Sequence, residues 1–259
     1  MDITKLFDVA GKTALVTGGS GGIGYMIAEG LARAGCKVFI VSRKVAGITA
    51  AAERLSAFGS VTPIAADLGT AEGVAAVAAQ VNAGTLNILV NNAGTTWGAP
   101  IDEFPREGFE KVLKLNLLAP FELTKSLLPA LRAGATAEDP ARVINIASID
   151  GLKLPEWESY PYSATKSGLI HMTRHLGKFL AGENISVNAI APGLFPSKMS
   201  DTIVDFSDPD AVAAMASPLG ARVGTPEDIS GAVLYLSSRA GAWLTGVTIP
   251  VGGGRGTVD

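Results

Sequence analysis

The stretch KTALVTGGSGGIG, from Lys12 to Gly24, decides the fold of this chain. Its first half, Lys12 to Thr17, is almost uniformly apolar, which is typical of a strand buried on both faces of a sheet. The glycine-rich half is followed by a helical pattern that continues to Ala34, and Gly35 stands where that helix should end. A strand, a glycine turn and a helix in this order predict a dinucleotide-binding turn. The glycines let the backbone approach a pyrophosphate at the helix N-terminus.

The spacing of these glycines departs from the common G-x-G-x-x-G pattern. With Gly18, Gly22 and Gly24 as the working set, the pattern is T-G-x-x-x-G-x-G. A flexible glycine-rich linker is the alternative, and the flanking strand and helix speak against it. We expect the turn to contact the cofactor through Gly18, Ser20, Gly22, Ile23 and Gly24.

The end of the second predicted strand, Lys37 to Ser42, indicates which cofactor is bound. In NAD-binding proteins an acidic residue near this point binds the ribose hydroxyls. Here Ser42, Arg43 and Lys44 occupy that place, so no carboxylate is present to repel a 2′-phosphate. The planar fork of Arg43 suits a phosphate. The pattern favours NADP(H) over NAD(H), but NAD(H) stays open because a solvated pair of bases is common at strand ends.

Strand and helix patterns alternate along the rest of the chain, without a repeat or an internal linker. The further strands are predicted at Val61 to Asp67, Asn87 to Gly94, Arg142 to Ser148, Ile185 to Ala191 and Val247 to Val251. The further helices are predicted at Val45 to Gly59, Thr70 to Ala83, Ser163 to Leu180 and Pro226 to Ser237. Phe104 to Ala133 is predicted to form one or two helices, with Pro120 as a candidate kink. This alternation predicts an α/β fold in a single domain over residues 1–259. Its centre would be a Rossmann-type, doubly wound, mainly parallel seven-stranded sheet flanked by helices.

Polar residues and glycines gather at the carboxyl ends of these strands, where ligands bind in doubly wound sheets. The ends carry Gly18, Ser42, Asp67, Asn92, Ser148 and Pro192. The predicted cofactor-binding set adds their neighbours Arg43, Leu68, Ala93, Gly94, Gly193 and Phe195. Loops that converge on one edge of the sheet are stronger evidence for a cofactor site than any single motif.

A tyrosine and a lysine, Tyr162 and Lys166, stand four residues apart in the sequence YSATK. Four residues apart on a helix is one face, so the phenol and the ammonium group can point into the same space. An unperturbed tyrosine titrates near pH ~10, and a nearby cation lowers that pKa. A tyrosine tuned in this way can pass a proton to or from an alcohol or carbonyl oxygen. A surface tyrosine near an unrelated lysine is the alternative, since the spacing alone is common.

Composition and charge speak against several other classes of protein. The 259 residues are 47% apolar with a net charge of −3, so nothing indicates binding to nucleic acid or to an anionic membrane. No basic leader or bilayer-length apolar run is present, and the single cysteine, Cys36, suits a reducing compartment. We therefore expect a cytoplasmic protein. His171 and His175 stand four apart on a helix but lack a third ligand, so no metal site is predicted.

Together these motifs resemble the single-domain short-chain dehydrogenase/reductase family over essentially the whole chain. The resemblance is carried by TGGSGGIG at Thr17 to Gly24, NNAG at Asn91 to Gly94, LNL around Asn116, Ser148, YSATK at Tyr162 to Lys166, and PG at Pro192 and Gly193. Within the family, the runs NNAGTTWGA, PARVINIAS and IAPGLFPSKM are similar to 3-oxoacyl-[acyl-carrier-protein] reductases, including those of rhamnolipid synthesis.

The resemblance implies a role for each of four residues. Tyr162 would be the general acid/base, and Lys166 would bind the nicotinamide ribose and lower the pKa of Tyr162. Ser148 would hydrogen-bond the substrate oxygen, and Asn116 would hold a water that links Lys166 to solvent. The Tyr162 spacing is preferred over that of Tyr160, which is on another face of the helix from Lys166.

The reaction that the resemblance implies is hydride transfer between a nicotinamide and a ketone or secondary alcohol. A 3-oxoacyl thioester is the expected substrate. A dehydrogenase of a sugar or polyol and a non-catalytic nucleotide sensor are the alternatives. The family likeness also implies a homotetramer.

Two residues depart from the family pattern. Many NADP(H)-using relatives have a basic residue where this chain has Gly21, which leaves Arg43 as the main phosphate partner. Many relatives also carry an Asp-Gly-Gly run near the end of the chain. Here Gly252 replaces the aspartate, so we expect a subunit contact or a carboxyl-terminal contact to differ.

The segment Phe195 to Pro218 follows the turn at Pro192 and Gly193, and it is rich in prolines yet apolar along its length. We expect this segment to close over the ligand as a substrate lid. A permanently packed excursion is the alternative. The side chains near it that either line an apolar pocket or pack the lid are Trp97, Trp157, Phe195 and Met199.

Overall fold

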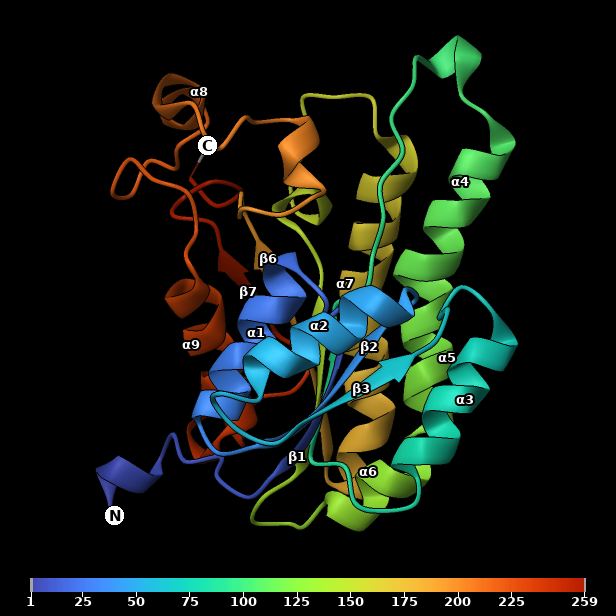
Figure 1. Ribbon diagram of the computed structural model, residues 1–259, viewed down its shortest axis with the longest axis vertical. Helices are drawn as coiled ribbons and strands as arrows, with labels where there is room; N and C mark the ends of the chain where they lie inside the picture. The colour runs from blue at the N-terminus through green and yellow to red at the C-terminus, as the bar shows by residue number, and fades with distance from the viewer. Residues whose placement is uncertain (1, 259) are drawn as a thin grey trace.

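A parallel sheet forms the middle layer of the molecule in the computed structural model, which describes residues 2–258 (Figure 1). Its seven strands are ordered β3-β2-β1-β4-β5-β6-β7, and each neighbouring pair is parallel. The strands are β1 (Thr13–Thr17), β2 (Lys37–Ser42), β3 (Val61–Ala65), β4 (Ile88–Asn91), β5 (Ala141–Ile146), β6 (Ile185–Pro192) and β7 (Thr248–Val251). The chain adds β2 and β3 on one side of β1 and then crosses back to add β4 to β7 on the other. This is the doubly wound topology.

Helices cover both faces of the sheet (Figure 1). One face packs against α1 (Gly22–Arg33), α2 (Val45–Leu55) and α9 (Pro226–Ser237). The other packs against α3 (Ala71–Val81), α5 (Ala119–Ser126), α6 (Leu128–Gly134) and α7 (Tyr160–Leu180). Every residue of β5 and β6 is buried, as expected for strands covered on both faces. The predicted fold class is confirmed.

The predicted strands are all present, but several of them end earlier than predicted. β3 ends at Ala65 because Asp67 instead forms a tight turn, accepting a hydrogen bond from the Gly69 amide at 2.9 Å. β4 ends at Asn91, since the next two backbone amides donate to a side chain of β1 rather than to a neighbouring strand. β6 runs one residue further than predicted, to Pro192.

The stretch from Phe104 to Ala133, predicted to form one or two helices, is divided into more segments than predicted. The stretch consists of α4 (Arg106–Leu113), a π-helical segment at Lys114–Leu118, then α5 and α6. Pro120 is in the first turn of α5, directly after the π-helical segment, so the helix departs from the regular repeat next to the candidate kink. A second interruption is at Leu127, between α5 and α6.

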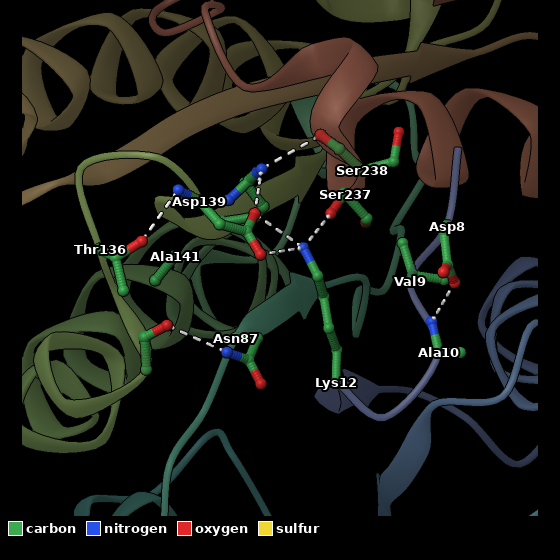
Figure 2. A network of polar contacts seen from close by, with 12 residues as sticks. Asp8, Val9, Ala10, Lys12, Asn87, Thr136, Asp139, Ala141, Ser237 and Ser238 are labelled. Carbon is green, nitrogen blue, oxygen red and sulfur yellow. Dashed lines mark hydrogen bonds and ion pairs between the residues drawn. The ribbon is translucent and has the colours of Figure 1, made fainter. Parts of the chain in front are cut away.

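A buried arginine ties the far end of the sheet together, at the edge opposite the strand carboxyl ends. Arg142 of β5 has a side chain only 1% exposed, and its Nη2 donates to Asp139 at 2.8 Å and to the carbonyl of Ser238 at 3.1 Å. Lys12 reaches the same carboxylate at 2.8 Å and the carbonyl of Ser237 at 3.2 Å. Figure 2 shows the Lys12 ammonium between the Asp139 carboxylate and Ser237, the last residue of α9.

These contacts fix the charges of the network. Burial lowers the pKa of Arg142, and Asp139 opposes that effect. Burial alone would raise the pKa of Asp139, but the hydrogen bond and charge of Lys12, followed by those of Arg142, bring it below its usual value. Asp139 therefore stays ionised and compensates a cation that has left water.

We expect Asp139→Asn to lower the free energy of unfolding by about 2 kcal/mol at neutral pH. This is less than the cost for a fully buried pair, because the Asp139 side chain is 43% exposed. Since the folded-state pKa of Asp139 is depressed, its contribution is present above the unfolded value of about 3.9 and is lost as pH falls through the lower folded value. Urea unfolding at pH 7 and at pH 3 measures both effects.

The matched control for this prediction is Glu138→Gln at the neighbouring exposed carboxylate, which should leave the free energy of unfolding unchanged. Equal stability of the Asp139→Asn and Glu138→Gln proteins at pH 7 would show that the network contributes nothing measurable.

Candidate active site

The glycine turn between β1 and α1 is so tightly built that side chains would not fit. Gly18 and Gly22 have φ of 72° and 54°, a left-handed conformation that favours glycine. A Cβ at Gly24 would lie 2.4 Å from the carbonyl oxygen of Gly18 and 2.4 Å from Nδ2 of Asn92. The turn therefore presents bare backbone and the free amide end of α1, which are the donors that bind a dinucleotide pyrophosphate. This geometry fits an NAD(P) cofactor.

Thr17 holds the turn after β4 against the glycine turn. Its Oγ1 accepts hydrogen bonds from the amides of Asn92 and Ala93, both at 2.9 Å. The side-chain amide of Asn92 returns a hydrogen bond to the carbonyl of Thr17 at 2.8 Å. The sequence assigns Thr17 no such role; the only signal is a hydroxyl at the end of a central, otherwise apolar strand. The predicted cofactor residues Gly18, Asn92, Ala93 and Gly94 are thereby brought together.

The predicted phosphate-selecting residues also come together, with one correction. Ser20 donates to Ser42 at 3.0 Å, and Ser42, Arg43 and Leu68 line one pocket with Gly18 and Gly94. No carboxylate is next to Arg43 in the sequence, but in the folded protein Asp67 lies 4.0 Å from the Arg43 guanidinium. The interpretation that no carboxylate is present at this place is therefore wrong. Both side chains are largely exposed, so this pair is weak and leaves Arg43 able to bind a phosphate.

The predicted catalytic residues Tyr162, Lys166 and Ser148 form one cluster at the carboxyl end of β5. Both Tyr162 and Lys166 lie in α7, which starts at Tyr160, earlier than predicted. The Lys166 ammonium is 5.6 Å from the centre of the Tyr162 ring and donates to the carbonyl of Ile146 at 2.7 Å. Ser148 accepts from the amide of Asp150 at 3.1 Å and is hydrogen-bonded to Tyr162.

The pKa of Tyr162 is raised, which corrects the prediction that Lys166 lowers it. Burial is the main cause of the rise to about 12; the hydrogen bond with Ser148 lowers the value, and the charge of Asp150 raises it further. The residue as a whole is half-buried, because it also borders a cavity. Burial also lowers the pKa of Lys166 to about 8. At neutral pH the phenol therefore keeps its proton and is a proton donor.

Asn116 is fully buried in the π-helical segment and joins three parts of the site. Its side-chain amide donates to the carbonyl of Thr95 at 2.9 Å and accepts from the Thr95 amide at 2.8 Å. It also donates to the hydroxyl of Thr165, between Tyr162 and Lys166, at 3.3 Å. A π-helical segment inside a helix is frequent at functional sites. The water that Asn116 would hold for Lys166 stays a prediction.

A cavity of about 130 Å³ opens beside Tyr162 and Ser148. Its apolar walls come mainly from the segment after β6 and include Ile23, Trp157, Leu194, Phe195, Met199 and Ile203. Gly193 lines the cavity, and Pro192 ends β6 just before it. Trp97 does not line it: its ring packs against Gly108, and Lys111 lies 5.2 Å from the ring centre. Of the side chains that were expected either to line a pocket or to pack the lid, Trp157 and Met199 line the cavity. Trp97 instead packs against a helix.

Across residues 2–258, no three metal-binding side chains gather in one place, and the His175 ring packs on Phe179 with ring centres 5.1 Å apart. In the same part of the chain, no helix has the length and apolarity needed to cross a membrane.

The family model for short chain dehydrogenases matches residues 12–208 of this chain. The protein therefore belongs to the short-chain dehydrogenase family and is an oxidoreductase. Within that family it is 46% identical to the rhamnolipids biosynthesis 3-oxoacyl-[acyl-carrier-protein] reductase of Pseudomonas aeruginosa, over 96% of this chain and 97% of the relative. This confirms the closer resemblance predicted from the sequence.

A solved structure and a relative that acts on another substrate are also similar to this chain. The RhlG/NADP active-site complex of Pseudomonas aeruginosa superposes with a TM-score of 0.92 at 45% identity, covering 97% of this chain and 99% of that one. The gluconate 5-dehydrogenase of Gluconobacter oxydans is 31% identical, over 98% of each chain.

We expect Tyr162→Phe to lower turnover by at least ~10²-fold, because the ring remains while the proton donor is lost. Steady-state oxidation of NADPH measures turnover, and cofactor titration should show unchanged binding. The matched control is Tyr160→Phe, two residues away on the same helix, whose hydroxyl is hydrogen-bonded to the exposed Glu158 instead of facing the cavity. Near-normal turnover of the Tyr162→Phe protein would contradict the assignment.

Proposed function

We propose that this protein transfers a hydride between NADP(H) and a ketone or secondary alcohol, and that its substrate is a 3-oxoacyl thioester. The observation that carries this proposal is the protonated phenol of Tyr162, hydrogen-bonded to Ser148 at the wall of an apolar cavity. A neutral phenol at this place is the acid that a ketone reduction needs. The likeness to the 3-oxoacyl-[acyl-carrier-protein] reductase supports the choice of substrate.

The residues of the site would each have a distinct role in binding the cofactor or in transferring the proton. The glycine turn and the N-terminus of α1 would bind the pyrophosphate, and the bound nicotinamide would supply the hydride. Ser148 would donate a hydrogen bond to the substrate carbonyl, since its Oγ already accepts one from the Asp150 amide. Tyr162 would give its proton to the same oxygen as the carbonyl carbon is reduced. Lys166, held by Ile146, would then stabilise the phenolate.

The walls of the cavity support an acyl chain over a polyol. Its apolar side chains, such as Trp157 and Met199, offer a long hydroxylated substrate few hydrogen-bond partners. A sugar or polyol dehydrogenase remains the second candidate, because Asp150 and Thr96 also line the cavity and a gluconate 5-dehydrogenase is among the relatives. A comparison of NADPH oxidation with 3-oxoacyl thioesters and keto-sugars discriminates the two.

The preference for NADP(H) rests on Arg43, supported by the Ser20–Ser42 pair beside it. We expect Arg43→Ala to weaken NADPH binding by about 1.5 kcal/mol, the lower end for a hydrogen bond to a charged group, because the side chain is exposed. NADH binding should barely change. Calorimetric titration with both cofactors measures the difference, and equal losses for NADPH and NADH would show that Arg43 does not bind the 2′-phosphate.

We also propose that residues 195–218 act as a lid over the cavity. Phe195 and Ser200 anchor the segment, being 3% and 6% exposed, whereas α8 (Pro209–Ala214) has no buried residue. In Figure 1, α8 projects at the same end of the molecule as the C-terminus. A poorly packed helix above an active site is suited to open and close.

Hydrogen exchange measures this motion. We expect the amides of residues 205–216 to exchange fast without ligands and to be protected when NADPH and a substrate analogue are both bound. The core of α9 serves as an internal control whose exchange should not change. Equal protection of the lid with and without ligands would mean that it is ordinary packed structure.

Assembly and location complete the proposal. Exposed apolar side chains on α4, the π-helical segment and α5, namely Phe109, Leu113, Leu118 and Phe121, support a homotetramer built across these helices. A cytoplasmic location is supported by Cys36, which is buried and free of any disulfide.

A further inference from the structure

The cavity beside Tyr162 contains a cation that the proposed reaction does not use. Arg255, from the tail that follows β7, is one of the residues that line it. Arg255 is half-buried, and no carboxylate within residues 2–258 forms an ion pair with its guanidinium. Asp150 lines the same cavity, but the charge that acts on its pKa is that of Lys153, not Arg255. Within residues 2–258, therefore, no carboxylate neutralises this cation through an ion pair.

The tail is folded back onto the active site by specific contacts. The Gly193 amide donates to the last residue of β7, Val251, at 2.9 Å, and the Leu219 amide donates to the carbonyl of Gly253 at 2.9 Å. A Cβ at Gly256 would lie 2.8 Å from Cβ of Ile149, so the tail touches the residue that follows Ser148. Arg255 is thus held between two contacts, one with Leu219, directly after the lid, and one with the catalytic segment.

Gly252 is the residue that permits this fold of the tail. It stands where the family pattern has an aspartate, and the sequence leaves the consequence of that departure open. A Cβ at Gly252 would lie 2.7 Å from the carbonyl oxygen of Arg255 and 3.3 Å from Cγ2 of Ile149. Because backbone cannot yield cheaply at the first of these distances, the familial aspartate and the observed position of Arg255 exclude each other. The replacement of the aspartate by Gly252 and the position of Arg255 in the cavity therefore depend on each other.

We propose that Arg255 is a specificity-determining residue that binds an anionic group, a carboxylate or a phosphate, carried by the 3-oxoacyl substrate. The proposal rests on the proposed function. A guanidinium presents a planar pair of donors that matches either anion, and the apolar walls around it strengthen the attraction. Arg255 and Tyr162 line one small cavity, so an anion bound by Arg255 lies on the substrate side of the site. A thioester has no free carboxylate, so its anion is a phosphate of the coenzyme A carrier, at the far end of the pantetheine arm. A free 3-oxo acid presents its own carboxylate next to the reacting carbonyl.

Kinetics with matched substrates test the proposal. NADPH oxidation by the full-length protein is followed with 3-oxohexanoate, its methyl ester, its N-acetylcysteamine thioester and its coenzyme A thioester. We expect Arg255→Ala to raise KM for the anionic substrate that is recognised by at least ~10-fold, the loss of a charge-assisted hydrogen bond, with little change in kcat. For the methyl ester and the N-acetylcysteamine thioester, KM should change less than about 2-fold, since no anion is present. Arg255→Lys, which keeps the charge without the fork, should fall between the two proteins.

The pattern of losses identifies the anion. A loss confined to 3-oxohexanoate assigns the substrate carboxylate, and a loss confined to the coenzyme A thioester assigns the carrier phosphates. Gly252→Asp, which keeps Arg255 in the sequence but displaces the tail that carries it, should reproduce the same substrate pattern. Equal changes for charged and neutral substrates, or no change for any of them, would overturn the proposal.

Failure of the proposed function gives a different result. If the wild-type protein oxidises NADPH with none of the four compounds, the 3-oxoacyl assignment is wrong, whatever Arg255 does. Calorimetric binding of 3-oxohexanoate to the NADP⁺ complexes of the wild-type and Arg255→Ala proteins then tests the anion site alone. Tighter binding to the wild type would support the anion site without the reaction, and equal binding would reject it.

Discussion

The buried ammonium of Lys166 imposes the constraint on which the rest of the site depends. An ammonium group that has left water needs a hydrogen-bond acceptor, and here the acceptor is the carbonyl of Ile146, the last residue of β5. That carbonyl is available because the strand ends there. Its end in turn places Ser148 two residues further on, at the mouth of the cavity. With Lys166 tied to the strand, the preceding turn of α7 can place Tyr162 only beside Ser148.

The same constraint explains why the site is so dense. A Cβ on Gly94 would lie 3.2 Å from the side-chain oxygen of Asn116 and 3.7 Å from the ammonium of Lys166. Asn116 uses its whole side chain to hold the backbone of Thr95 and the hydroxyl of Thr165. The strand turn, the interrupted helix and α7 are therefore positioned against one another by side chains that never meet the substrate. Burial in this packing raises the pKa of Tyr162 further above neutral pH.

Local patterns in the sequence predict the parts of this arrangement that depend on neighbours along the chain. The glycine turn, the alternation of strands and helices and the spacing of Tyr162 and Lys166 are of this kind. The direction of the Tyr162 pKa is not, because it depends on how much protein surrounds the hydroxyl rather than on which charges are near it in sequence. The Asp67 carboxylate beside Arg43 and the Lys12 ammonium beside Arg142 likewise join residues from separate strands and loops. No periodicity in the sequence reports such pairs.

The motifs that define the family and the residues that surround the substrate lie in different parts of the chain. The motifs end strands β1, β4, β5 and β6 and begin α7, and they specify hydride transfer in general. The cavity walls come mainly from the segment after β6, with further residues from the loop between β5 and α7 and with Arg255 from the tail after β7. Identity of the reaction can therefore be inferred from the sequence more readily than identity of the substrate.

The π-helical segment at Lys114–Leu118 amounts to one extra residue wound into an otherwise regular helix. Pro120 has no N–H to offer the carbonyl of Asn116 four residues earlier, so a regular α-helix would leave that buried carbonyl without its usual donor. Removal of a single residue from the segment would restore the ordinary repeat and turn the helix before it by about 100°. The Asn116 side chain would then leave Thr95 and Thr165. Insertions and deletions, and not substitutions alone, therefore set the limits within which this helix can evolve without loss of the active site.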